Sequence, residues 1–279
     1  MDLYEACCFF LIYSFLGWVI EVVYHAVTFG KIMNRGFLNG PVCPVYGFGM
    51  TAVLFMFDIL GTDDPVAVFI IGTLLTTVIE LTAGWALYTF FHARWWDYSN
   101  MPLNLGGYIC PAFSMIWGLA VLAVVRIAHP AIEAVTVGLI PVSILLPLIV
   151  ILMILMIIDT SVTAATLIGL NKKLRELDDI SKAMRDYSDK LTEKIGKRTI
   201  ATTQSAQTAR VQAALAKAEL KDAADITKAD LEQRYEEIRA SILRHRHYGA
   251  GRLINVFPNV NHRYYRDILD DIKSKLHSR

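Results

Sequence analysis

Five long apolar segments fill the first 170 residues, and their length limits what the chain can fold into. A bilayer core about 30 Å thick is crossed by roughly 20 apolar residues in helical form. The segments that meet this requirement are Leu3–Val27, Val45–Leu60, Val66–Phe91, Tyr108–Ile127 and a stretch within Val135–Leu170. We therefore predict an all-α, polytopic membrane helix bundle with about five spans.

Charge divides the chain near Leu170. Of the 27 Lys and Arg and the 26 Asp and Glu in the chain, residues 1–170 hold only four and ten. The remaining residues are polar enough to need water. We predict a transmembrane domain over residues 1–170 and a cytoplasmic helical or coiled-coil tail over residues 171–279, in a protein whose first partner is the lipid bilayer.

The basic residues of the loops predict an orientation. Lys31 and Arg35 follow the first segment, Arg94 follows the third, and Lys172 and Lys173 follow the last. Positive charge favours the cytoplasmic side of a membrane. We expect a multi-pass protein of the cell membrane with its N-terminus outside and its tail in the cytoplasm.

The transmembrane domain contains an internal repeat with a shift of 67 residues. The matched landmarks are Gly17-Trp18 with Gly84-Trp85, His25 with His92, Gly40 with Gly107, and Cys43-Pro44 with Cys110-Pro111. An even number of helices returns the chain to its starting side, so we predict parallel repeats over about residues 1–62 and 63–130. A fifth span over about residues 138–170 follows, and such repeats are frequent in transporters.

Ionisable side chains inside a bilayer cost free energy and usually face the protein interior. Three carboxylates lie in or near this environment: Glu21, Glu80 and Asp159. They could form a cation, proton or substrate site. They could equally make structural contacts, for example with Arg35 or with a hydroxyl group such as that of Tyr24 or Thr163.

The stretch Asn34–Gly49 holds four Gly and two Pro, which preclude a regular helix through most of it. It could be a re-entrant loop whose backbone binds a ligand, because irregular backbone is tolerated at membrane depth where it lines a cavity. It could also be a tight interfacial turn, which we favour slightly. We include Asn34, Arg35 and, from the equivalent stretch of the second repeat, Asp97 in the candidate ligand or ion site.

Metal, cofactor and enzyme motifs are weak or missing in the sequence. His25, His92, Cys43 and Cys110 could in principle bind zinc, but their spacing matches no compact zinc motif. The phosphate-binding loop of ATPases is missing, as are the hydrolase and metalloprotease motifs. We expect no cofactor, no resident metal and no enzymatic activity.

The tail shows helical periodicity. One apolar series begins at Leu170 and continues to Leu191, and a second includes Val211, Leu215 and Ile242. They could form an antiparallel hairpin or an oligomeric coiled coil, so a homo-oligomer is one possible state. A final helix is expected near Tyr264–Leu276. No fold motif indicates nucleic-acid binding.

Several motifs together resemble a known family. They are Gly17-Trp18-x-x-Glu21, Asn34-Arg35-Gly36-Phe37-Leu38-x-Gly40-Pro41-x-x-Pro44-x-Tyr46-Gly47-x-Gly49, Trp96-Asp97-Tyr98-Ser99, Asn104-x-x-Gly107, Trp117-Gly118 and His129-Pro130. Over roughly Phe10–Leu170 the chain is similar to the putative ABC-transporter type IV family of bacterial membrane proteins. The resemblance implies a permease-like transport component, served by an ATPase on a separate chain. The alternative is a non-transporting sensor or scaffold whose tail binds partners.

Overall fold

The computed structural model describes residues 1–62, 64–202, 228–244, 248–257 and 259–277. It is divided into two compact units, and each is considered by itself. The first, the membrane unit, combines residues 1–168 with residues 247–264. The second, the tail unit, combines residues 169–246 with residues 265–279.

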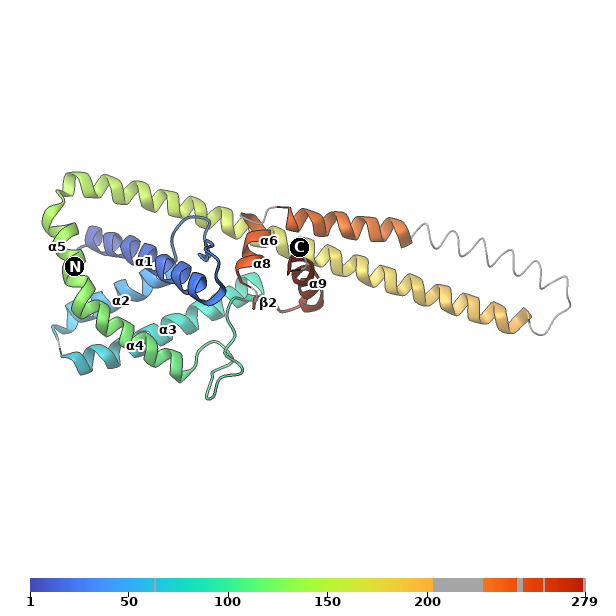
Figure 1. Ribbon diagram of the computed structural model, residues 1–279, viewed down its shortest axis with the longest axis horizontal. Helices are drawn as coiled ribbons and strands as arrows, with labels where there is room; N and C mark the ends of the chain where they lie inside the picture. Colours follow the sequence, from blue (N-terminus) through green and yellow to red (C-terminus); the bar gives the residue numbers. More distant parts are fainter. Residues whose placement is uncertain (63, 203–227, 245–247, 258, 278–279) are drawn as a thin grey trace. The chain divides into compact units, whose positions relative to one another are not determined.

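The membrane unit begins with four helices that pack in chain order, α1 on α2, α2 on α3 and α3 on α4 (Figure 1). Their bounds are α1 Leu3–Phe29, α2 Pro44–Leu60, α3 Pro65–Phe91 and α4 Pro111–Ala123. Proline is the first residue of α2, α3 and α4, where its missing N–H group leaves no helical bond unmade. Glycines with positive φ, Gly30 and Gly61, follow α1 and α2.

Among the described residues, four helical stretches are long and apolar enough to cross a membrane: Leu3–Phe29, Pro65–Phe91, Pro111–Thr136 and Val142–Lys190. The remaining predicted span, Val45–Leu60, is the shorter apolar helix α2, which has 17 residues. Only 11% of the most apolar part of α3 is buried within the protein. Such surfaces need lipid as their solvent, so the predicted all-α membrane helix bundle is confirmed.

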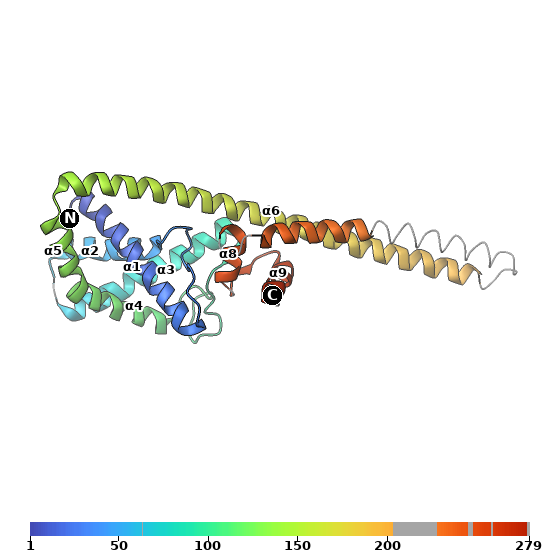
Figure 2. The same cartoon turned by 45° about the horizontal axis from the view of Figure 1, so that its top comes forward.

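The repeat is visible as two helix pairs, α1–α2 and α3–α4, each joined by a loop (Figures 1 and 2). We call residues 30–43 loop 1 and residues 92–110 loop 2. Cys43 and Cys110 each immediately precede the second helix of a pair, as the shift of 67 predicts. The same shift from Phe29 predicts an end at residue 96, yet α3 ends at Phe91. Loop 2 is therefore the longer loop.

Small residues allow close contact within the first pair. A Cβ atom added to Gly17 would overlap the Tyr46 ring, and one added to Gly47 would lie 2.5 Å from the Phe10 carbonyl oxygen. In a membrane, where apolar burial gives little driving force between helices, such close contact is a main source of stability. The glycines of the sequence motif therefore hold α1 and α2 together.

A π-helical turn, η1 (Val124–Ala128), connects α4 to α5 (His129–Leu139). Pro130 follows this turn and lacks the N–H group that a regular α-helix would use. A π turn is a common way to accommodate such an interruption. The helical path therefore continues past Ile127, where the sequence placed the end of the fourth span.

The last long helix, α6, covers Val142–Thr202. Pro141 immediately precedes it, and Pro147 lies inside the helix. At 1.5 Å per residue, Asp159 lies about 26 Å from the start of α6. With a start this early, Asp159 is placed near the far end of a bilayer crossing rather than at mid-depth.

Residues from beyond α6 return to the membrane unit. They include α8 (Gly249–Val256) and a two-residue strand, β2 (Asn261–His262). This strand pairs antiparallel with β1 (Ala93–Arg94) in loop 2, with Ala93 opposite His262. We call residues 248–264 the strap.

The tail unit is helical. The part of α6 that belongs to it pairs antiparallel with a helix over residues 228–243, through Lys173 with Ser241 at 3.0 Å and Glu176 with Arg234 at 3.2 Å. The final helix α9 (Arg266–His277) docks through Asp271, which accepts a hydrogen bond from Tyr235. The tail was predicted to form an antiparallel hairpin or an oligomeric coiled coil, and these antiparallel contacts are of the hairpin type. Val211 and Leu215, which were part of that prediction, lie outside the described residues.

Candidate functional site

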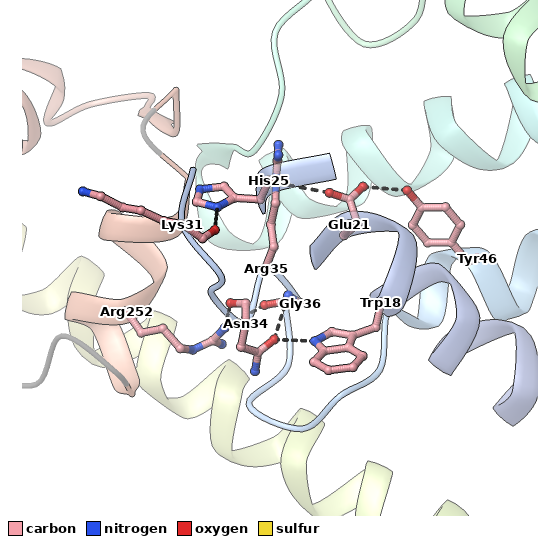
Figure 3. A network of polar contacts seen from close by, with 9 residues as sticks. All are labelled: Trp18, Glu21, His25, Lys31, Asn34, Arg35, Gly36, Tyr46 and Arg252. Carbon is pink, nitrogen blue, oxygen red and sulfur yellow. Dashed lines mark hydrogen bonds and ion pairs between the residues drawn. The ribbon is translucent and has the colours of Figure 1, made fainter. Parts of the chain in front are cut away.

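Glu21, in the C-terminal half of α1, is held by two groups (Figure 3). The Arg35 guanidinium of loop 1 lies 3.2 Å from one of its carboxylate oxygens. The Tyr46 hydroxyl of α2 donates a hydrogen bond of 2.6 Å to the other. Arg35 also lies over the Tyr24 ring, 5.0 Å from its centroid. Glu21 is thus a half-buried carboxylate with one cation and one hydroxyl donor.

Asn34 organises the turn of loop 1 that precedes this ion pair. Its side-chain oxygen accepts hydrogen bonds from the Trp18 indole at 2.7 Å and from the Gly36 amide at 2.9 Å (Figure 3). Its side-chain nitrogen donates to the Asn39 carbonyl at 2.6 Å. All three contacts are made by one amide side chain, so Asn34 acts as a brace of loop 1 rather than as a free ligand.

Arg252 of the strap fills a cage of backbone carbonyl groups in loop 1. Its guanidinium donates to the carbonyl oxygens of Asn34 at 3.2 Å, Gly36 at 2.8 Å, Phe37 at 3.2 Å and Leu38 at 3.1 Å. Arg252 is 3% exposed. Burial lowers the pKa of Arg252, and the negative charge of Asp159 opposes this effect.

Asp159 binds the next part of loop 1. Its carboxylate accepts hydrogen bonds from the Asn39 amide at 3.1 Å, the Asn39 side chain at 2.9 Å and the Gly40 amide at 2.6 Å. Thr163, one helical turn further, also contacts the Asn39 side chain at 3.1 Å. An anion and a cation from distant segments therefore hold loop 1 by its backbone N–H and C=O groups, respectively.

Glu80 of α3 is bound from loop 2. The Tyr98 hydroxyl donates a hydrogen bond of 3.0 Å to one Glu80 oxygen, and the Tyr98 ring stacks on Phe113 at 4.8 Å. Burial raises the pKa of the Tyr98 phenol, and the nearby charges of Glu80 and, more weakly, of Glu21 add to the rise. Glu21 and Glu80 therefore lie within electrostatic reach of the same phenol.

Asp97 organises loop 2 from within. It accepts hydrogen bonds from the Ser99 amide at 3.0 Å and from the Ser99 hydroxyl at 2.5 Å. The Arg94 guanidinium lies 3.7 Å away and is held between the Tyr88 and Tyr108 rings. Asp97 is exposed, so its role in the candidate site is local.

The six predicted site residues thus divide into separate sets of contacts. Glu21 and Arg35 meet, Asn34 and Asp159 hold different parts of loop 1, and Glu80 and Asp97 belong to α3 and loop 2. Within the described residues, no hydrogen bond or ion pair joins any two of the three carboxylates of the membrane spans. The sequence analysis did not single out Arg252, which donates hydrogen bonds to backbone carbonyl groups of loop 1. It also did not single out Asn39, whose backbone amide and side chain donate to Asp159.

The four weak metal candidates have other roles. His25 is buried, and its Nδ1 atom is 2.8 Å from the Lys31 carbonyl oxygen (Figure 3). Cys43 and Cys110 are buried at helix starts, and His92 packs against Tyr264 at 5.3 Å. In the part of the chain that the structure describes, no three His, Cys, Asp or Glu side chains gather in a way that could hold a metal ion.

Trp95 of loop 2 is 8% exposed, and its ring packs edge-on against Phe37 of loop 1 and Phe257 of the strap, at 5.2 and 4.9 Å. Trp95 therefore joins three segments rather than facing lipid.

Taken together, the site offers two half-buried carboxylates, each bound by a tyrosine hydroxyl, and one guanidinium that is paired with Glu21. Such a set can bind or release a cation or a proton, because carboxylate oxygens have lone pairs for a further partner. It holds no arrangement of nucleophile and base.

Comparison with known proteins gives one result. A family model described as putative ABC-transporter type IV matches residues 8–164. Searches of curated proteins and of solved structures find no significant match. The matched residues include Glu21, Glu80 and Asp159 together with all of loops 1 and 2.

Proposed function

We propose, on the premise that the chain belongs to the putative ABC-transporter type IV family, that it is the permease-like membrane component of a transporter. Membership supports a transport-related role, and the four long apolar helices make this a multi-pass membrane protein. The observation that carries the proposal is the overlap of the match with the carboxylates inside the membrane unit. Glu21 and Glu80, with their tyrosine partners, are the proposed ion or substrate contacts.

The energy source must come from another chain if ATP drives transport. The sequence has no phosphate-binding loop, because the upstream glycine that Gly196-Lys197 would need is missing. We therefore propose a separate ATPase subunit that binds the cytoplasmic face.

Affinity purification of the full chain from its native membrane, in mild detergent, tests this partner. We expect an ATPase of the ABC type to copurify in a fixed ratio, with ATP hydrolysis that is slowed severalfold by Glu21→Gln. Arg266→Ala, which changes an exposed residue of α9, is the matched control. A purified complex without any ATPase, or hydrolysis that is equal in both variants, would contradict the proposal.

The proposed orientation places loops 1 and 2 and the tail in the cytoplasm, with the N-terminus outside. The strap contacts both loops, so both loops lie on one face of the membrane unit. This is possible only if α2 crosses the bilayer, since otherwise α3 would carry loop 2 to the opposite face. At about 25 Å, α2 is short for a span but within the range that bilayers accommodate.

The second candidate function is a sensor or scaffold. The observation that favours it is the tail unit's own apolar core, which includes the fully buried residues Leu174, Leu177 and Ile272. A packed unit of this kind can bind a protein partner. Crosslinking of the full chain in cells, with the partner identified as something other than an ATPase, would favour this function over transport.

A further inference from the structure

The strap has a feature that the transport proposal does not use: it contacts both loops of the repeat. At its start, Arg252 fills the carbonyl cage of loop 1. At its end, β2 pairs with β1 of loop 2, and the Arg263 amide donates a hydrogen bond of 2.8 Å to the His92 carbonyl oxygen. One segment of the chain therefore binds the equivalent loops of the two repeats.

The middle of the strap strengthens this link. Phe257 packs edge-on against Trp95 of loop 2, which in turn packs edge-on against Phe37 of loop 1. The carbonyl groups of Phe37 and its neighbour Leu38 bind Arg252. The contacts thus run from Arg252 to loop 1, from Phe37 of loop 1 to Trp95 of loop 2, and from Trp95 back to the strap at Phe257.

Loop 1 depends on Arg252 for its backbone. Four carbonyl groups point at one guanidinium, and without it they would lose this donor at buried or part-buried sites, which is costly for backbone acceptors. A charged donor with planar geometry suits this task, because a guanidinium presents several N–H groups in fixed directions. Few other side chains could satisfy the same four oxygens.

Loop 1 also carries the partners of two candidate site residues. Arg35, between the caged carbonyl groups of Asn34 and Gly36, forms the ion pair with Glu21. Asn39 and Gly40, just beyond the caged carbonyl of Leu38, bind Asp159. Whatever fixes the cage therefore fixes the partners of Glu21 and Asp159.

The chain reaches the strap from the tail unit and returns to it. Residues on either side of the strap, up to 246 and from 265 onward, belong to that unit. The strap is thus a covalently anchored segment that docks on the membrane unit, and not an integral part of a membrane helix.

We propose that the strap is a latch which couples loop 1 to loop 2 and, through loop 1, holds Arg35 and the Asn39–Gly40 amides on Glu21 and Asp159. The latch rests on the proposed function only for its biological role, which is to control the proposed ion or substrate contacts. When the strap is docked, both loops are fixed; when it is released, both loops and both carboxylates are freed together.

Hydrogen exchange of the full chain in lipid nanodiscs tests the coupling at each end. Arg252→Ala removes a contact with loop 1, and we expect exchange at least tenfold faster not only at Asn39 and Gly40 but also at the Arg263 amide. Phe257→Ala removes a contact with loop 2 at the other side, and we expect faster exchange at Asn39 and Gly40. Arg266→Ala is the control and leaves both regions unchanged.

The outcomes separate this inference from the transport proposal, because exchange does not require a substrate or an ATPase. Changes confined to the mutated end in both variants would overturn the latch. If Arg252→Ala does not fold, Arg252→Lys retains the charge but cannot reach four carbonyl oxygens, and Phe257→Ala still tests the link from the opposite end. Exchange that rises at both loops while transport is unaffected would retain the latch and remove the link to transport.

Discussion

Loops 1 and 2 occupy equivalent places in the predicted repeat, and each places a glycine against a carboxylate. Gly40 of loop 1 lies against Asp159, and Gly107 of loop 2 lies against Asp97. In loop 2 this carboxylate belongs to the loop itself, whereas in loop 1 it comes from α6, about 120 positions along the chain. The two loops therefore share the contact between a glycine and a carboxylate, but the carboxylate comes from different parts of the chain.

The difference extends to the other contacts. Loop 2 is braced by Asn104, which bonds to Ser99, Met101 and Gly107 inside the same loop. Loop 1 has an internal brace in Asn34 as well, but its backbone carbonyl and amide groups are also bound by Arg252 and Asp159 from outside. In the latch that we propose, loop 1 is therefore the loop whose backbone depends on distant side chains.

The largest expected difference comes from removing the two carboxylates. Asp159→Ala deletes three hydrogen bonds to a charged acceptor, and we expect the opening free energy of loop 1 to fall by roughly 2–4 kcal/mol. Asp97→Ala, the matched variant in loop 2, deletes its two hydrogen bonds with Ser99 at an exposed site. It should lower the opening free energy of loop 2 by about 1 kcal/mol. Hydrogen exchange of the loop amides measures both. Equal losses of opening free energy in the two loops would contradict the proposed difference between their anchors.

Glycine substitution should destabilise loop 2 more than loop 1, which is the reverse of the order expected for the carboxylate variants. Gly107 has φ +75°, and an added Cβ atom would lie 2.6 Å from both Asp97 and Ser99 oxygens. We expect Gly107→Ala to destabilise loop 2 by about 2 kcal/mol, from backbone strain and overlap. Gly40→Ala meets only the Asp159 oxygen at 3.1 Å and has no positive φ, so it should cost less. Thermal unfolding in nanodiscs provides the readout, and a more harmful Gly40→Ala would contradict the account.

Acid should loosen the strap at loop 2. Burial, and secondly the nearby His92, lower the pKa of His262 from 6.5 to about 4. Arg263 and Tyr264 follow His262 in the chain, and Arg94 follows its strand partner Ala93; none of these three neighbours is an anion. A lowered histidine pKa stabilises the docked state above pH 6.5, and this contribution is lost as the pH falls toward 4.

We therefore expect exchange at the Arg263 amide, corrected for its intrinsic pH dependence, to rise about tenfold between pH 7 and pH 5. His262→Gln, which cannot be protonated, should flatten this profile. A profile that is unchanged in His262→Gln would show that another group is responsible.

The smallest expected effects are alike in the two loops. The Trp18 indole donates to Asn34 of loop 1 at 2.7 Å, and the Trp96 indole donates to the Tyr108 carbonyl of loop 2 at 2.9 Å. Trp18→Phe and Trp96→Phe each remove one hydrogen bond, and about 1 kcal/mol of stability should be lost in each. A much larger effect in one of them, measured by exchange, would reveal a further difference between the loops.

Much of the fold could be predicted from the sequence, because long apolar runs and helix-initiating prolines such as Pro44 and Pro111 act locally. The Glu21–Arg35 ion pair was foreseen as one alternative, since charges in lipid need partners. Arg252 could not be foreseen, because backbone carbonyl groups of a distant loop leave no mark in the sequence. For the same reason Asp159 was a candidate while its role as the anchor of Asn39 and Gly40 was not.

Cysteine labelling tests the central claim, that loops 1 and 2 share one face of the membrane. Ile32 of loop 1 and Leu103 of loop 2 are 86% and 87% exposed, and Leu139, at the end of α5, is 75% exposed. Single cysteines at these positions would be treated with a membrane-impermeant maleimide in intact cells and in inside-out vesicles, with the unsubstituted chain as background. The account predicts that positions 32 and 103 label only in inside-out vesicles and position 139 only in intact cells. Labelling of 32 and 103 from opposite sides would contradict it.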